Sequence, residues 1–109
     1  MELEETIEFT SRTICLSPAF AALKKAKEIL EADSNSFKLL ADFENKRNLA
    51  YSPNTPENRR TQLVNELNND FTKLNQTPEF KNYFEASDKF NMFVGGLFDK
   101  IISLVRKNL

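Results

Sequence analysis

Hydrophobic residues recur every three to four positions along most of this chain, the spacing that places side chains on one face of an α-helix. The first such segment runs from Leu3 to about Cys15, with Leu3, Ile7 and Ile14 near one face. A second helix is predicted from Pro18 to about Ala32. Its apolar stripe consists of Phe20, Leu23, Ala26, Ile29 and Leu30.

Three further helices follow from the same periodicity. A third helix is predicted between Asp33, its expected N-cap, and Tyr51, and a fourth from Thr55-Pro56-Glu57 to about Asn75. The fifth and longest runs from Pro78 to roughly Lys107. No segment shows the alternation typical of a β-strand. The sequence therefore predicts an all-α bundle of about five helices with a long C-terminal helix, in one domain over residues 1–109.

Three of these helices are predicted to begin with a hydroxyl residue followed by proline. The pairs are Ser17-Pro18, Thr55-Pro56 and Thr77-Pro78. A hydroxyl at the N-cap accepts an otherwise unpaired backbone N–H, and proline at the first helical position has no N–H to leave unpaired. Residues 52–56 contain two of the four prolines and are expected to form the linker between the third and fourth helices.

The residue inventory argues against most enzyme and metal chemistry. Histidine is absent, which removes the usual general base near neutral pH and the commonest metal ligand. Cys15 is the only cysteine and is interpreted as a small apolar packing residue. No carboxylates repeat on the apolar faces, as a di-metal site in a bundle requires. We therefore expect no catalytic residues, no metal, no cofactor and a non-enzymatic protein.

Charge and hydropathy bear on partners and location. The net charge is −1, without the one-sided basic field that nucleic acid attracts, so direct nucleic-acid binding is not expected. The N-terminus is acidic, unlike a signal peptide, and no apolar stretch approaches the roughly 20 residues of a membrane helix. A single cysteine allows no intramolecular disulfide. The prediction is a cytoplasmic protein without membrane insertion.

Gly95 and Gly96 are the only glycines, and they lie inside the most apolar predicted helix. Each costs about 1 kcal/mol relative to alanine in a helix interior. They indicate either a local kink or space for a neighbouring helix in the same subunit, or a close crossing between two subunits. On the second interpretation the chain is a homodimer through its fifth helix. The candidate interface residues are Phe90, Phe93, Val94, Gly95, Gly96, Leu97, Phe98 and Ile101.

Aromatic and charged residues allow other interpretations. The density of Phe80, Phe84, Phe90 and Phe93 suggests, as an alternative function, a helical module that binds a small apolar ligand. The basic pairs are expected to be solvated surface, and so are Glu66 and Asp70. Among those pairs only Arg59-Arg60, beside the linker, is a candidate for docking a partner.

The order of these elements resembles the YlbF/YmcA/YheA family of small all-helical bacterial regulatory proteins. The matching segments are residues 16–23, the break at 31–33, residues 37–43, and Phe90-Asn91-Met92-Phe93-Val94-Gly95 with Ile101-Ile102 beyond. The resemblance implies a homodimer or hetero-oligomer that acts as an adaptor or regulator, for example in developmental control, and it brings no catalytic residues.

Some members of this family act with a membrane-associated ribonuclease in RNA processing, and certain of these carry cysteines associated with an iron–sulfur cluster. Because this chain has only Cys15, the cluster is not carried over. A YheA-like member is the closer resemblance.

Overall fold

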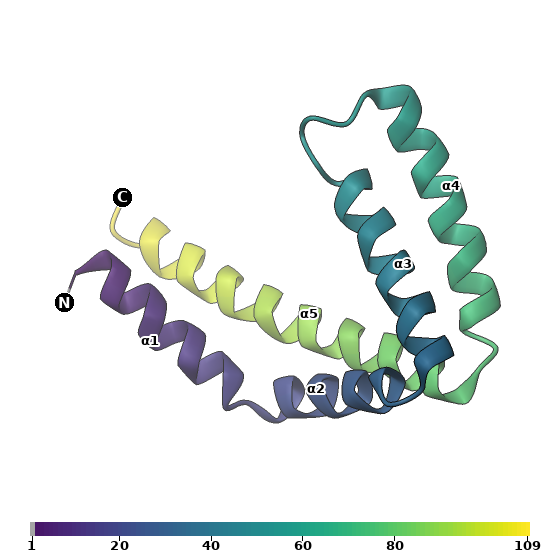
Figure 1. Ribbon diagram of the computed structural model, residues 1–109. Helices are drawn as coiled ribbons and strands as arrows, with labels where there is room; N and C mark the ends of the chain where they lie inside the picture. The colour runs from purple at the N-terminus through teal and green to yellow at the C-terminus, as the bar shows by residue number, and fades with distance from the viewer. Residues whose placement is uncertain (1) are drawn as a thin grey trace. The chain divides into compact units, whose positions relative to one another are not determined.

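The computed structural model describes residues 2–109, which form five α-helices and no strand (Figure 1). The helices are α1 (Leu3–Cys15), α2 (Pro18–Glu31), α3 (Ser34–Ala50), α4 (Glu57–Leu74) and α5 (Pro78–Arg106). The predicted all-α class is confirmed, and each helix begins and ends within a residue or two of its predicted position.

Contacts within the chain divide it into two compact units. One contains α1, the part of α2 up to Ala26, and α5 from Tyr83 onward; the other runs from Lys27 to Asn82. Both α2 and α5 therefore begin in one unit and end in the other. That the chain is a single domain stays a prediction.

The unit from Lys27 to Asn82 is built on an antiparallel pair, α3 and α4, joined by the short linker (Figure 1). Its core contains Ala50 at the end of α3 and Leu63 and Leu67 on α4, with Phe43 packed against them. Leu63 and Leu67 are four residues apart and so lie on the same face of α4, toward α3. The face of α4 that carries Leu63 and Leu67 is therefore buried within the chain.

Arg60, at the start of α4, holds the linker in place. Its Nε donates to the carbonyl oxygen of Ala50 (3.0 Å), and its Nη2 donates to those of Ser52 (3.1 Å) and Thr55 (3.2 Å). Three carbonyl groups, one on the last residue of α3 and two in the linker, thus accept hydrogen bonds from one planar cation. Arg60 serves the chain's own loop, and only Arg59 of the pair remains turned to solvent, next to Gln62.

Arg60→Ala is expected to lower the free energy of unfolding by about 1–3 kcal/mol, because it leaves three carbonyls without their charged donor. Urea unfolding followed by helical circular dichroism measures the change. Arg59→Ala is the matched control, and its effect should stay within about 0.5 kcal/mol. Equal effects of the two variants would show that the hydrogen bonds of Arg60 do not stabilise the hairpin.

The helix starts follow their predicted chemistry at two positions and depart from it at a third. Ser17 Oγ accepts from the backbone N–H of Phe20 (3.2 Å), and Asp33 Oδ2 accepts from that of Ser36 (2.9 Å). The latter bond lowers the pKa of Asp33. The prediction that Thr55 caps α4 is wrong, because its hydroxyl donates to the carbonyl oxygen of Leu49 (2.6 Å) and Pro56 takes the N-cap position.

Candidate functional site

Helix α1 is amphipathic but buries none of its residues. Its apolar side chains are largely exposed, with Leu3 at 76% and Phe9 at 59% of their full accessibility. Cys15 is exposed as well, so its interpretation as a packing residue is wrong. An isolated helix of 13 residues is marginal in water, and proteins normally stabilise such a helix by packing its apolar face.

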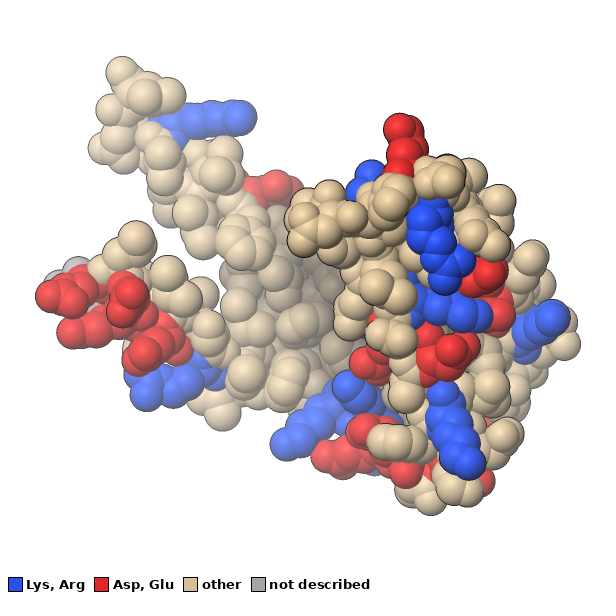
Figure 2. Space-filling model, turned by 45° about the horizontal axis from the view of Figure 1, so that its top comes forward, with Lys and Arg blue, Asp and Glu red and all other residues tan. Residues whose placement is uncertain are grey.

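The C-terminal half of α5 has the same character. From residue 91 onward none of its residues is buried, whereas Tyr83 near its start is. The exposed large hydrophobic residues here are Met92, Phe93, Phe98, Ile101, Ile102, Leu104 and Val105. Figure 2 shows this end of α5, at the upper left, with few charged side chains. We call these seven exposed hydrophobic residues of α5, together with Leu3, Ile7 and Phe9 of α1, the α1–α5 surface.

A shallow apolar groove joins the two helices of this surface. Phe9 and Ile14 of α1 and Phe93 and Leu97 of α5 line a cavity of about 190 Å³, with the hydroxyl residues Thr10 and Thr13 at its side. All six residues belong to the same compact unit. The groove makes the exposed faces of α1 and α5 one continuous apolar region.

The candidate interface residues of α5 divide between packed and exposed positions. Phe90 is half-buried, and its ring lies 6.0 Å from that of Phe20. Val94 and Leu97 are also half-buried, while the other five are exposed. These five are Phe93, Gly95, Gly96, Phe98 and Ile101. Three of the eight predicted interface residues, Phe93, Phe98 and Ile101, therefore belong to the α1–α5 surface, and that they form an interface stays a prediction.

The two glycines leave space that the fold of this chain does not use. A Cβ built on Gly95 or Gly96 meets no heavy atom within 4 Å outside its own stretch of helix. Neither glycine has a positive φ, and α5 continues through both as one helix. No neighbouring helix of the same chain thus requires a glycine at either position, and no backbone conformation does.

The four phenylalanines that suggested a small apolar ligand have separate surroundings. Phe80 is buried and lines a cavity beside α3 and α4, whereas Phe93 lines the groove next to α1. The ring of Phe84 lies 5.7 Å from that of Tyr83, edge to face, and Phe90 packs on Phe20. These contacts are those of packing residues in helices.

An ion-pair network between α3 and α4 was missed by the sequence analysis. Lys46 Nζ lies 2.8 Å from Asp70 Oδ2 and 3.3 Å from Asp42 Oδ2. The hydrogen bond to Asp70, followed by that to Asp42, raises the pKa of Lys46 against the opposing effect of desolvation. Asp70 is therefore not part of a merely solvated face. The spacing of Asp42 and Lys46 is a sequence signal, but Asp70 is 24 residues from Lys46 and gives none.

Lys46→Met is expected to reduce the free energy of unfolding by about 0.5–1 kcal/mol near neutral pH. Since the folded pKa is raised, this stabilisation is complete below the ordinary lysine value of 10.5 and is lost as pH rises through the folded pKa above it. Urea titrations at pH 7 and above pH 10.5 measure the difference between wild type and variant. Lys38→Met, on the exposed part of α3, should show no such pH dependence.

Residues 2–109 offer neither a metal site nor a membrane-spanning helix. No set of three or more His, Cys, Asp or Glu side chains in this range is arranged to hold a metal ion. No helix there is both long enough and apolar enough to cross a lipid bilayer.

Comparison with known proteins gives one family. The family model described as "Control of competence regulator ComK, YlbF/YmcA" matches residues 4–106, nearly the whole chain. No curated protein and no solved structure matches the chain.

Proposed function

The chain belongs to the YlbF/YmcA family of regulators, and we propose that it is a non-enzymatic cytoplasmic adaptor that acts through protein–protein contacts at the α1–α5 surface. The observation that carries this proposal is the exposure of apolar side chains along both helices. Exposed apolar regions of this kind, in a regulatory family, mark interaction sites more often than they mark a solvated surface. That the chain is a YheA-like member stays a prediction.

The first occupant that we propose for this surface is a second copy of the chain. A two-fold interface places the same patch on both subunits, so one glycine of the pair in one α5 would face the same glycine in the other. A close crossing of two α5 helices would use the space that a missing Cβ leaves at Gly95 or Gly96. It would also cover Phe98, three residues after Gly95 on the same face, and at its edge Ile101, four residues after Leu97 of the groove.

Charge supports the same arrangement. Glu2 precedes α1, whose first half carries Glu4, Glu5 and Glu8; the end of α5 carries Lys100 and Arg106, followed by Lys107, with Asp99 as the one acidic residue among them. Figure 2 shows the acidic side chains gathered at the beginning of α1, at the left. Opposite charges at the ends of the two helices favour association between copies and help to fix its register.

Sedimentation equilibrium tests self-association directly. The wild-type chain is expected to be a dimer, and Ile101→Glu a monomer, because burying an unpaired carboxylate in an apolar interface is strongly unfavourable. Leu49→Glu is the matched control on α3, since Leu49 and Ile101 are 44% and 47% exposed. A monomeric wild type, or a dimer insensitive to Ile101→Glu, would contradict the proposed interface.

A complementation experiment tests the regulatory role. A strain of the source organism that lacks this gene would receive the wild type, Ile101→Glu or Leu49→Glu, and the output of ComK would be measured where the organism has it. Wild type and Leu49→Glu are expected to restore regulation, and Ile101→Glu is not. Full complementation by Ile101→Glu, at equal protein level, would show that regulation does not depend on the α1–α5 surface.

A further inference from the structure

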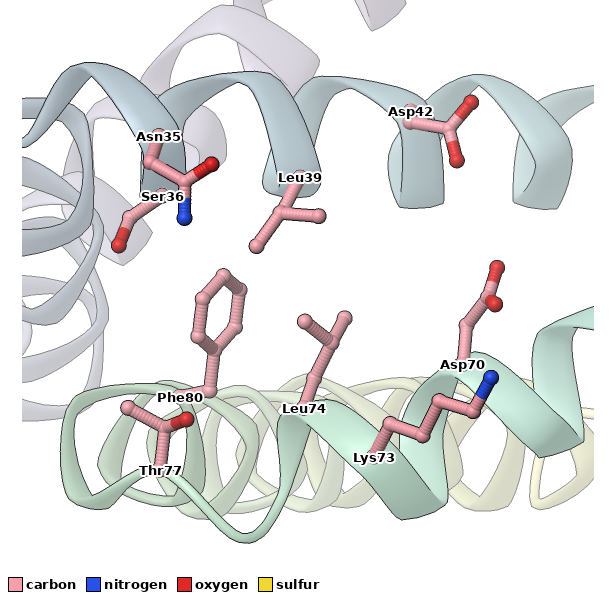
Figure 3. Close-up of a pocket in the computed structure, with 9 residues that line it drawn as sticks. All are labelled: Asn35, Ser36, Leu39, Asp42, Asp70, Lys73, Leu74, Thr77 and Phe80. Atoms are coloured by element: carbon pink, nitrogen blue, oxygen red, sulfur yellow. The ribbon is translucent and has the colours of Figure 1, made fainter.

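The unit from Lys27 to Asn82 contains a second feature, independent of the α1–α5 surface. A cavity of about 400 Å³ lies between α3 and α4 and reaches the first turn of α5 (Figure 3). Cavities that bind small molecules fall in the range of about 300–1,000 Å³ and combine an apolar wall with a few polar groups. This cavity has both, and they are separated along its length.

One end of the cavity carries charges of both signs. Asp42 from α3 and Asp70 from α4 contribute carboxylates, and Lys73 contributes an ammonium. Figure 3 shows the amine of Lys73 directed toward Asp70. Lys46 already pairs with both carboxylates, so the four side chains together are electrically neutral. Each carboxylate has about four acceptor sites, and one bond to Lys46 leaves capacity for a further donor.

The middle of the cavity is apolar. Leu39 of α3 and Leu74 of α4 point toward each other across it, and the ring of Phe80 stands beside them (Figure 3). Phe80 is buried, while Leu39 is 42% exposed and Leu74 half-buried, so a bound molecule would cover leucine surface that now faces water. Burial of apolar surface contributes about 25 cal/mol per Å².

We infer that this cavity binds a free amino acid with an apolar side chain. The ammonium group of such a zwitterion pairs with the carboxylates of Asp42 and Asp70, and its carboxylate pairs with the ammonium group of Lys73. Its apolar side chain packs on Leu39 and Leu74, beside Phe80. A neutral cluster of opposite charges is complementary to a ligand that carries both charges. A ligand with only one of them leaves a charged group of the protein without its partner, which weakens binding.

Isothermal titration of the full-length chain with L-phenylalanine and L-leucine tests this inference. Two further probes, phenethylamine and 3-phenylpropanoate, keep the aromatic side chain of phenylalanine but lack one of its charges. We expect saturable 1:1 binding of an amino acid, and binding at least about tenfold weaker for both single-charge compounds. Glycine, which has no side chain, should not bind measurably.

Variants distinguish this cavity from other surfaces. Lys73→Met is expected to weaken L-phenylalanine about tenfold and to leave phenethylamine unchanged, because only the carboxylate loses its partner. Lys38→Met, an exposed lysine of α3 outside the cavity, should change neither. The variant Ile101→Glu should bind L-phenylalanine as the wild type does. The test of the proposed dimer and the test of the cavity are therefore independent of each other.

Several outcomes would overturn the inference. These are no saturable binding of either amino acid, equal binding of 3-phenylpropanoate and L-phenylalanine, or binding that Lys73→Met does not affect. Amide chemical shifts measured in an NMR titration with the same amino acids locate the site, and shift changes confined to α1 and the C-terminal half of α5 would also overturn the inference.

Discussion

Replacing Leu63 with alanine is expected to lower the free energy of unfolding by about 2–5 kcal/mol, the largest effect of any single truncation proposed for this chain. Leu63 is 1% exposed, and with Ala50 and Leu67 it forms the core of the α3–α4 pair. Removing its side chain leaves a cavity where Ala50 has no side-chain atoms beyond Cβ to fill the space. Urea unfolding monitored by circular dichroism measures the loss.

Val64→Ala is the matched control for that experiment. Val64 is the next residue on the same helix and is 36% exposed, so its truncation removes less buried surface and should cost under about 1 kcal/mol. Similar losses for Leu63→Ala and Val64→Ala would mean that the face of α4 carrying Leu63 does not form the core of this unit.

The helices of this chain could be predicted because local signals agree with one another. The apolar spacing and the prolines at 18, 56 and 78 place the elements, and Asp33 is the N-cap that its position indicates. Thr55-Pro56 is the exception. A hydroxyl residue followed by proline also begins α2 and α5, but here the linker folds back so that the Thr55 hydroxyl donates to the carbonyl oxygen of Leu49. A turn that depends on a contact six residues away is not encoded in a two-residue motif.

Periodicity also could not tell which apolar stripes the chain would bury. Helices α1 and α4 both carry an apolar stripe, yet α4 buries Leu63 and Leu67 while α1 buries no residue. An apolar stripe indicates that one face of a helix is kept away from water. It does not indicate whether the same chain or another molecule covers that face. The structure distinguishes α4 from α1 by the solvent exposure of their apolar side chains.

The cavity between α3 and α4 could not be predicted from the sequence for a similar reason. Asp42 and Asp70 are 28 positions apart along the chain, and nothing in their neighbours marks them as a pair. They share one lysine because α3 and α4 run side by side. The charged end of the cavity depends on the tertiary contact between α3 and α4. In the sequence alone, each of its residues therefore looks like a solvent-exposed surface residue.

Gly95→Leu is expected to have opposite effects on the stability of the helix and on association. Within one chain the new side chain meets no obstacle, and leucine favours the helix over glycine by roughly 0.8 kcal/mol, so α5 becomes more stable. In a dimer whose α5 helices cross at the glycines, the same side chain is added twice to one contact. Overpacking costs about 1–3 kcal/mol for each addition, which weakens association roughly thirtyfold or more.

Sedimentation equilibrium over a range of concentrations measures the dissociation constant of the dimer. Thermal unfolding at low concentration, where the monomer dominates, measures the effect of the substitution on the stability of the monomer. Gly96→Leu is the matched variant, because successive helical residues point about 100° apart and only one of the two glycines can face the centre of a crossing. One variant should therefore dissociate the dimer much more than the other, while both raise the melting temperature of the monomer. If both variants keep the dimer constant of the wild type, the glycines do not permit a close approach between subunits, and the contact must lie further along α5 toward Ile101.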